Sequence, residues 1–204
     1  MILSILLPTT PDRFEISQPL YNELQRQDTY MRSYHATLGE IEILIDDRKR
    51  FLDGGPSIGK KREGLVQRAR GKYLCFIDSD DMIPGNYLET LVRACQKHYD
   101  IITFKALARL ETFWSMIDMS IHYSSDAEAN PSFVVQRIPS IVCPVKSVHA
   151  KMFSFEDVNY EEDYRWMKQV LTKCKSENHL SEILYEYRHG VHSEADQITK
   201  AGYV

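Results

Sequence analysis

Three short apolar runs in the first part of the chain predict three buried strands. They span residues 2–7, 41–45 and 73–77, are rich in Ile and Leu, and each ends at a polar cluster. Uninterrupted apolar runs of this length are typical of strands that are covered on both faces. Because helix-like stretches separate the runs, the pattern predicts an α/β fold with largely parallel strands.

Helical periodicity fills the intervals between these runs. One helix should begin after Ser57, a favourable N-cap residue, and end at Gly71. Its shared apolar face consists of Ile58, Leu65, Val66 and Ala69. A second helix should follow Pro84-Gly85, and residues 101–104 should return as a strand. This alternation predicts that residues 1–104 form a nucleotide-binding half of the α/β type. Residues 105–160 show a less regular pattern.

Composition favours one folded domain over 1–204. The hydrophobic fraction of 43%, with 9 Gly and 8 Pro, excludes collagen-like, low-complexity and wholly disordered chains. No linker separates the nucleotide-binding half, 1–104, from the second half, 105–204. The 25 Lys and Arg against 29 Asp and Glu give a net charge of −4, which argues against a dedicated nucleic-acid-backbone binder.

The chain carries no sign of export or of a membrane anchor. Pro8 ends the first apolar run, which is too short for a signal peptide or a membrane span. Four cysteines without C-x-x-C spacing lie in apolar surroundings, where reduced core thiols are expected: Cys75, Cys95, Cys143 and Cys174. These features predict a cytoplasmic protein without a transmembrane segment.

Polar clusters follow all three predicted strands, at residues 8–13, 46–48 and 78–81. Ligands of open α/β sheets bind beyond the carboxyl ends of the strands, so these clusters should lie together. Their carboxylates repel one another unless a positive group joins them, and a divalent cation that bridges a phosphate meets this need. Oxygen-only ligands favour Mg²⁺ or Mn²⁺. The alternative is that Asp80 and Asp81 merely cap the next helix.

The same residues resemble glycosyltransferase family 2, the nucleotide-sugar enzymes with an A-type fold. The match covers Ser4–Thr9, Ile45–Asp47, a specific stretch from Gly59 to Asp81, the pair Glu162-Asp163 and the segment 185–188. This resemblance implies a single-domain fold with a Rossmann-like mixed sheet flanked by helices, and it implies that residues 105–204 hold the acceptor site and the catalytic base. The chain departs from the family at Glu63, where the family often has Asn.

The resemblance also implies roles for single residues. It assigns donor binding to one set: Pro8 and Thr9 for the nucleoside, Asp47 for the base, Arg62 for nucleoside or diphosphate, and Asp78 and Ser79 for ribose and phosphates. It makes Asp80 the ligand of Mn²⁺ or Mg²⁺, with His189 or His192 as a further metal ligand. Lys60 and Lys61 are instead expected on a solvated helix face.

A third helix is predicted near residues 161–174, with an apolar face that consists of Trp166, Met167, Val170, Leu171 and Cys174. At 100° per residue, Asp163 is expected near the middle of this face and Glu162 is expected to point away. A carboxylate in that position is suited to accept a proton. The resemblance places the general base in the Glu162-Asp163 pair, and Asp163 is the expected base; an N-cap or a structural ion pair is the alternative.

Together these features predict a metal-dependent inverting glycosyltransferase. The donor would be a nucleoside-diphosphate sugar, a UDP-sugar by preference, and the acceptor a hydroxyl of a glycan or of a hydroxymethylated pyrimidine in DNA. The basic residues of 48–50 and 60–61 are the cluster that would support a DNA acceptor. Two alternatives are a nucleotidyltransferase, whose glycine-rich loop is missing after Leu7, and a noncatalytic nucleotide-sugar-binding module.

Overall fold

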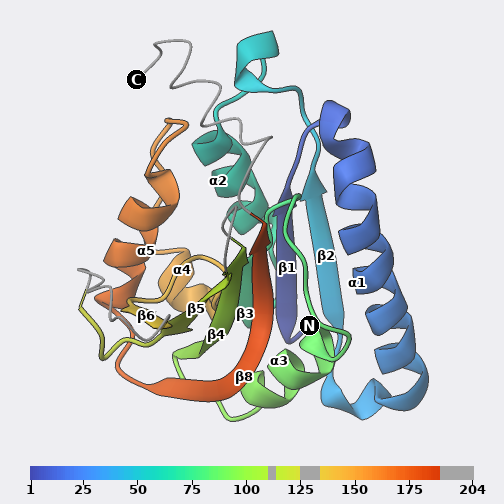
Figure 1. Ribbon diagram of the computed structural model, residues 1–204, viewed down its shortest axis with the longest axis vertical. Coiled ribbons are helices and arrows are strands. Elements are labelled where there is room, and N and C mark those ends of the chain that lie inside the picture. The colour runs from blue at the N-terminus through green and yellow to red at the C-terminus, as the bar shows by residue number, and fades with distance from the viewer. Residues whose placement is uncertain (110–113, 125–133, 189–204) are drawn as a thin grey trace.

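The computed structural model describes residues 1–109, 114–124 and 134–188, which form one mixed sheet with helices on both faces (Figure 1). The strands are β1 (Leu3–Pro8), β2 (Ile41–Asp46), β3 (Tyr73–Phe76), β4 (Ile101–Arg109), β5 (Trp114–Met119), β6 (Val134–Arg137), β7 (Val145–Lys146) and β8 (Glu177–Arg188). The helices are α1 (Phe14–Tyr34), α2 (Ile58–Arg68), α3 (Tyr87–Cys95), α4 (Ser147–Ala150) and α5 (Glu162–Leu171). Short 3-10 turns occupy Pro11–Arg13, Ala36–Leu38 and Phe51–Asp53.

The strand order is β2-β1-β3-β7-β4-β5-β6, with β8 paired to β4. The central strand β1 runs parallel to β2 and β3, which confirms the parallel arrangement predicted for the first half. Strand β7 is antiparallel to β3 and β4, and β5 is antiparallel to β4. The sheet is therefore mixed, and its pairing continues from the first half of the chain into the second.

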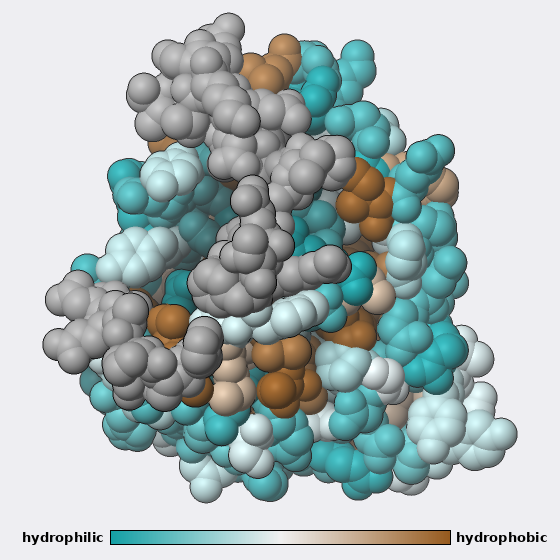
Figure 2. All heavy atoms as spheres, viewed as in Figure 1, coloured by the Kyte–Doolittle hydropathy of each residue, from teal (hydrophilic) through white to brown (hydrophobic). Residues whose placement is uncertain are grey.

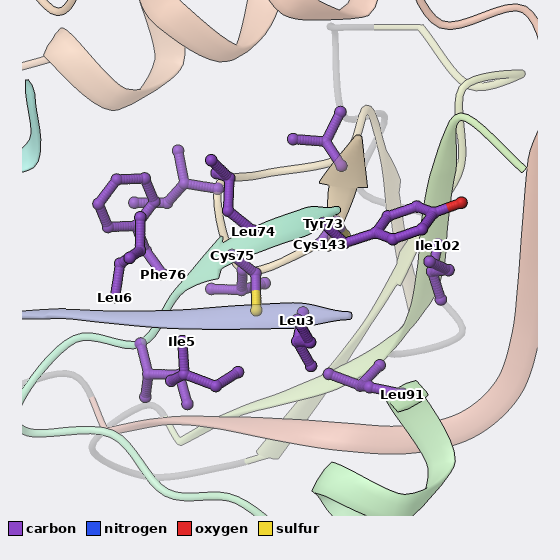
Figure 3. Close-up of a cluster of buried hydrophobic side chains, with 14 of the residues drawn as sticks. Leu3, Ile5, Leu6, Tyr73, Leu74, Cys75, Phe76, Leu91, Ile102 and Cys143 are labelled. Carbon is purple, nitrogen blue, oxygen red and sulfur yellow. The ribbon is translucent and has the colours of Figure 1, made fainter. Parts of the chain in front are cut away.

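The core lies on both faces of β1 and β3. Figure 3 shows Leu6 and Phe76 on one side of these strands and Leu3 and Cys75 on the other. The Phe76 ring packs edge to face against Trp166 of α5, with ring centroids 6.1 Å apart. On the opposite face, the Cys75 sulfur lies 3.7 Å from the Tyr87 hydroxyl of α3. Helices α3 and α5 thus cover opposite faces of the sheet.

All four cysteines are buried and free, as their apolar surroundings predicted. Burial raises the pKa of the Cys75 thiol to about 12 and that of Cys174 to about 12, so both stay protonated at neutral pH. These thiols are packing residues of the core.

Helix α1 packs against α3, and the outer side of α1 faces solvent. It buries Leu20, Leu24 and Met31, and the Gln27 side chain accepts a hydrogen bond from the Leu88 amide at 2.8 Å. The edge of the molecule that α1 forms is mostly hydrophilic in Figure 2. Within the described residues, no helix combines the length and the hydrophobicity needed to cross a lipid bilayer.

Candidate active site

A cavity of about 540 Å³ opens at the carboxyl ends of β1 and β3, where the sequence predicted a ligand site. Its wall combines segments from both halves of the chain: residues 8–10 and 13 after β1, 58 and 61–62 of α2, 78–81 after β3, 117 and 137 of β5 and β6, 140–142, 159–164, and 187–188 of β8. Most of the residues assigned to donor and base roles line this cavity.

Lys61 secures the cavity wall after β1. Its ammonium group donates to the carbonyl oxygen of Thr9 at 2.8 Å and to that of Arg48 at 2.6 Å. Lys61 is 1% exposed, so the expectation of a solvated lysine was wrong at this position. Two loop carbonyls need a donor here, and an ammonium group with three N–H bonds supplies it. The Thr9 hydroxyl itself has no hydrogen-bond partner among the described residues.

Two carboxylates of the cluster after β3 contact arginines from other segments: Asp80 contacts Arg13, and Asp78 contacts Arg62. Arg13 donates to the Ser79 hydroxyl at 3.1 Å and lies 3.5 Å from the Asp80 carboxylate. Asp80 and Ser79 are thereby held beside the β1 wall of the cavity. Asp78 accepts from Arg62 at 2.9 Å, which ties the start of this cluster to α2.

Asp81 is turned toward β8. Its carboxylate accepts from the Tyr185 hydroxyl at 2.7 Å and from the Arg188 amide at 2.8 Å. Burial, together with the negative charge of Asp78, raises the pKa of Asp81 to about 7. The capping alternative is therefore wrong for Asp81, which joins the third strand end to β8.

Arg62 joins the two acidic segments of the site. Its guanidinium donates to Glu162 on α5 and to Asp78 after β3, and the side chain is 7% exposed. Burial alone would lower the pKa of Arg62, but Asp78 and Glu162 outweigh it and raise the pKa. Both Nη groups are thus engaged with carboxylates of the chain itself. Whether Arg62 also contacts a nucleoside or diphosphate stays a prediction.

Glu162 is buried, and the expectation that it points away from the apolar face was wrong. It is 3% exposed and contacts Arg62, while Asp163 keeps partial exposure at the cavity wall. Glu162 lies four residues before Trp166, so the two side chains share one face of α5. Burial raises the pKa of Glu162, although the Arg62 charge opposes the rise.

Asp163 stands in the first turn of α5, where the helix dipole favours a negative charge. Its carboxylate accepts from the adjacent Tyr164 amide at 2.8 Å, and no ion pair holds it within the described part of the chain. Glu161, just before it, adopts a left-handed conformation with φ 58°, an uncommon geometry that often marks functional sites. Asp163 is therefore the carboxylate of the pair that remains available to a ligand.

Gly59 allows the segment before α5 to pack directly on α2. A Cβ at this position would lie 1.9 Å from the Glu156 carbonyl oxygen, so no side chain fits. The Gly59 amide donates to the Val158 carbonyl, and the Ile58 amide donates to the Asn159 side chain at 2.9 Å. Sequence reasoning missed this contact, although a glycine in the first turn of a helix was the available signal.

Two further contacts reinforce this packing. Ser57 caps α2, as predicted, by accepting from the Lys60 amide at 3.1 Å, and its hydroxyl also donates to Asp157 at 2.6 Å. Glu63 accepts from the Phe155 amide at 2.9 Å. Glu63, where the chain departs from the pattern of the family it resembles, therefore anchors the segment that leads to α5.

Asp47 does not line the cavity and is exposed at the end of β2. Its neighbour Asp46 is buried and binds Arg48, with the closest oxygen and nitrogen 2.6 Å apart. The base-recognition role of Asp47 stays a prediction, and it would place the base at the rim of the cavity.

The donor set fits a hard divalent cation. Asp78 and Asp80 supply carboxylate oxygens at the cavity wall, and Mg²⁺ is commonly bound through one or two carboxylates together with substrate phosphates. Within residues 1–109, 114–124 and 134–188, no three His, Cys, Asp or Glu side chains form a metal-binding group. The predicted ligands His189 and His192 lie outside the described residues.

Comparison with known proteins identifies a family and several solved structures with a similar fold. The family model for glycosyl transferase family 2 matches residues 57–160, half of the chain. The crystal structure of S. aureus TarS 1–349 is similar with a TM-score of 0.63 at 16% identity, over 92% of this chain and 60% of that one. The crystal structure of TarS 1–349 in complex with UDP-GlcNAc is similar with a TM-score of 0.63 at 15% identity, over 94% of this chain and 60% of that one. No curated protein sequence matches the chain.

The longer S. aureus TarS structure gives a TM-score of 0.64 at 16% identity, and the alignment covers 93% of this chain and 37% of TarS. The chain thus spans less than two thirds of the length of these relatives. At such low identity the likeness concerns the fold, and it confirms the predicted mixed α/β architecture.

Proposed function

The chain belongs to glycosyl transferase family 2, and on that basis we propose that it transfers a sugar from a nucleoside-diphosphate sugar to an acceptor hydroxyl. One observation carries the proposal: Asp163, without an ion-pair partner in the described chain, lines the same cavity as Asp78 and Asp80. A proton acceptor and a diphosphate-binding wall thus share one cavity. Residues 1–104 supply most of the donor wall and residues 105–204 supply the base.

The donor binds along the ends of β1 and β3 in this proposal. Pro8 and Thr9 contact the nucleoside, Asp47 accepts from the base at the rim, and Asp78 and Ser79 face the ribose and phosphates. Asp80 is the protein ligand of Mg²⁺ or Mn²⁺, and a bound cation of this kind neutralises charge on a departing diphosphate. Arg62 holds Asp78 and Glu162 in place and is a positioning residue.

Transfer proceeds in one displacement. Asp163 takes the proton of the acceptor hydroxyl as its oxygen forms a bond to the anomeric carbon. The bond from that carbon to the diphosphate oxygen breaks at the same time, and the nucleoside diphosphate leaves with the bonding electrons. Configuration at the anomeric carbon is therefore inverted.

The nucleoside is proposed to be uridine, because a similar structure is described in complex with UDP and another with UDP-GlcNAc. The free cysteines suit a reducing compartment, which supports a cytoplasmic location.

A DNA acceptor has little support, because four of the five residues in the basic cluster are neutralised or buried. Arg48 pairs with Asp46, Arg50 with Asp53, Lys60 with Asp157, and Lys61 with backbone carbonyls, which leaves Lys49 as an exposed lysine at this surface.

Two measurements test the proposal. Calorimetry with UDP, GDP, CDP and dTDP, with Mn²⁺ or with EDTA, should show metal-dependent binding with a preference for UDP. An assay with UDP-sugars and water as acceptor should then detect slow hydrolysis that Asp163→Asn lacks. Binding without any turnover would leave a noncatalytic nucleotide-sugar module, and equal binding in EDTA would remove the metal from the proposal.

A further inference from the structure

Arg137 is a cavity-wall arginine without a carboxylate partner in the described chain. It ends β6, is half-buried, and has no acidic oxygen within 4.0 Å among residues 1–109, 114–124 and 134–188. The other arginines of this wall each have an acidic partner: Arg13 has Asp80, Arg62 has Asp78 and Glu162, and Arg188 has Glu186. Arg137 thus differs from them in having its charge uncompensated.

The position of Arg137 separates it from the donor wall. Strands β5 and β6 lie at the far end of the sheet from β2 and β1, with β3, β7 and β4 between them (Figure 1). The donor carboxylates Asp78 and Asp80 follow β3, whereas Arg137 pairs in register with Met119 of β5. A ligand group that reaches Arg137 therefore lies on the acceptor side of the cavity.

Hydroxyl groups accompany the guanidinium on this side. The Tyr187 hydroxyl lies 2.9 Å from the Ser140 hydroxyl, and both residues line the cavity. Burial raises the pKa of Tyr187, and the positive charge of Arg137 opposes part of that rise, which indicates that the charge acts at this hydroxyl pair. The Arg137 guanidinium therefore lies beside a polar pair on this side of the cavity, and it is the group there that carries a positive charge.

A half-buried cation is partly removed from water, and an anion from the ligand restores the lost interactions. Guanidinium groups bind carboxylates and phosphates through two parallel N–H bonds, which adds both affinity and geometric selectivity. The wall around Arg137 therefore selects a ligand by its negative charge.

We propose that Arg137 binds an anionic group, a phosphate or a carboxylate, that the acceptor carries near its reacting hydroxyl. The inference rests on the proposed function and adds the chemical class of its acceptor. Arg137 is then the residue that determines acceptor specificity, while the diphosphate of the donor binds at the wall formed by β1 and β3.

The test uses the wild-type protein, Arg137→Gln and a control, Arg165→Gln, which removes an exposed arginine of α5 that does not line the cavity. Each protein is saturated with UDP and Mg²⁺ and titrated with inorganic phosphate, glycerol 3-phosphate, glycerate and glycerol. We expect the wild type and Arg165→Gln to bind either the phosphates or glycerate at least about tenfold more tightly than Arg137→Gln does. None of the three proteins should bind uncharged glycerol more tightly than the anions. The phosphate and glycerate arms tell which anion is used.

Three outcomes would overturn the inference. Equal anion affinity in all three proteins would remove Arg137 from the site, and so would a wild type that binds no anion. A loss of UDP affinity in Arg137→Gln as large as its loss of anion affinity would assign the arginine to the donor. Failure of UDP to bind the wild type is a different result, since it overturns the proposed function itself. Arg137→Lys, which keeps the charge without the planar fork, should show intermediate affinity if the protein is folded.

Discussion

The two walls of the cavity differ in how their charges are compensated. On the donor wall, formed by the ends of β1 and β3, Asp78 and Asp80 each face an arginine of the chain. On the opposite wall, Arg137 has no such partner in the described residues, and its strand β6 is only partly buried, whereas every residue of β1 is buried. The donor wall is therefore preorganised by internal ion pairs, and the opposite wall leaves a charge for the ligand to complete.

The same contrast separates the neighbours Glu162 and Asp163. Glu162 is buried against Arg62 and serves the donor wall, whereas Asp163 keeps its carboxylate at the cavity. Charged side chains that have an ion-pair partner within the chain should thus control stability and position. Charged side chains without such a partner, Asp163 and Arg137, should control turnover and specificity. The variants below test this division, with the neighbours Asp163 and Glu162 first and the other variants in order of decreasing effect on stability.

Asp163→Asn should have the largest effect on turnover. The change keeps the size of the side chain and removes its ability to accept a proton. We expect sugar transfer to fall by about 10² to 10⁴, the scale for loss of a positioned general base, with donor affinity and thermal stability retained. Steady-state kinetics, UDP calorimetry and thermal unfolding provide the three readouts.

Glu162→Gln is the matched neighbour of this variant. Because Glu162 shares the Arg62 charge with Asp78, we expect it to lower the unfolding free energy by about 1 to 3 kcal/mol and to reduce transfer less than Asp163→Asn. If Glu162→Gln abolishes transfer in a stably folded protein while Asp163→Asn is fully active, the base is Glu162 and the division fails.

Arg62→Met should have the largest effect on stability. It leaves Glu162 and Asp78 without their shared cation, and removal of one member of a buried ion pair costs about 3 to 5 kcal/mol. Urea unfolding of Arg62→Met and of the exposed control Arg165→Met measures the difference. The control should change by at most about 1 kcal/mol, as expected of a surface ion pair. An equal loss of unfolding free energy in both variants would show that the contacts of Arg62 with Asp78 and Glu162 contribute no more than a surface ion pair.

Much of the donor half was predictable from the sequence, because its signals are local. Buried parallel strands leave continuous apolar runs, and the polar cluster at residues 78–81 follows one of them directly. Lys61 was mispredicted because its partners are backbone carbonyls of distant loops, which no side-chain pattern reveals. Glu162 was mispredicted because its burial depends on an arginine that lies 100 residues earlier. Arg137 was missed because β6 is short and only partly buried, so its sequence carries little periodicity.

Gly59→Ala tests whether the packing of α2 on the segment before α5 positions the base. The added methyl group would collide with the Glu156 carbonyl, so we expect a loss of about 1 to 3 kcal/mol and reduced transfer. Gly64→Ala is the control on the same helix, since its nearest neighbour would be an Arg48 nitrogen at 3.6 Å. That change should stabilise the protein by about 0.5 to 1 kcal/mol, because alanine favours helix more than glycine does. Loss of stability without loss of transfer in Gly59→Ala would separate the packing from the base.

Asp100 gives the smallest predicted effect and tests a compensated charge outside the cavity. Its carboxylate accepts from the Lys146 ammonium at 2.9 Å, from the His149 ring at 3.2 Å, and from the amides of Lys175 and Ser176 at 2.9 and 3.1 Å. It thereby joins β4, the start of α4 and the loop before β8. Burial alone would raise the pKa of Asp100, but these hydrogen bonds outweigh it and hold the pKa well below its usual range.

Because the folded pKa of Asp100 is lowered, its contribution to stability is present above the unfolded pKa of about 4 and is lost as the pH falls toward the folded value. Asp100→Asn should therefore cost about 1 kcal/mol near neutral pH and progressively less in acid. Urea unfolding from pH 7 down to pH 2 should show the wild-type and Asp100→Asn curves converging, whereas Asp53→Asn, which alters an exposed pair with Arg50, should follow the wild type throughout. No transfer defect is expected in Asp100→Asn at neutral pH, since the residue lies outside the cavity wall. A constant difference between the Asp100→Asn and wild-type curves at every pH would show that the carboxylate charge contributes nothing, and that hydrogen bonding alone accounts for its role.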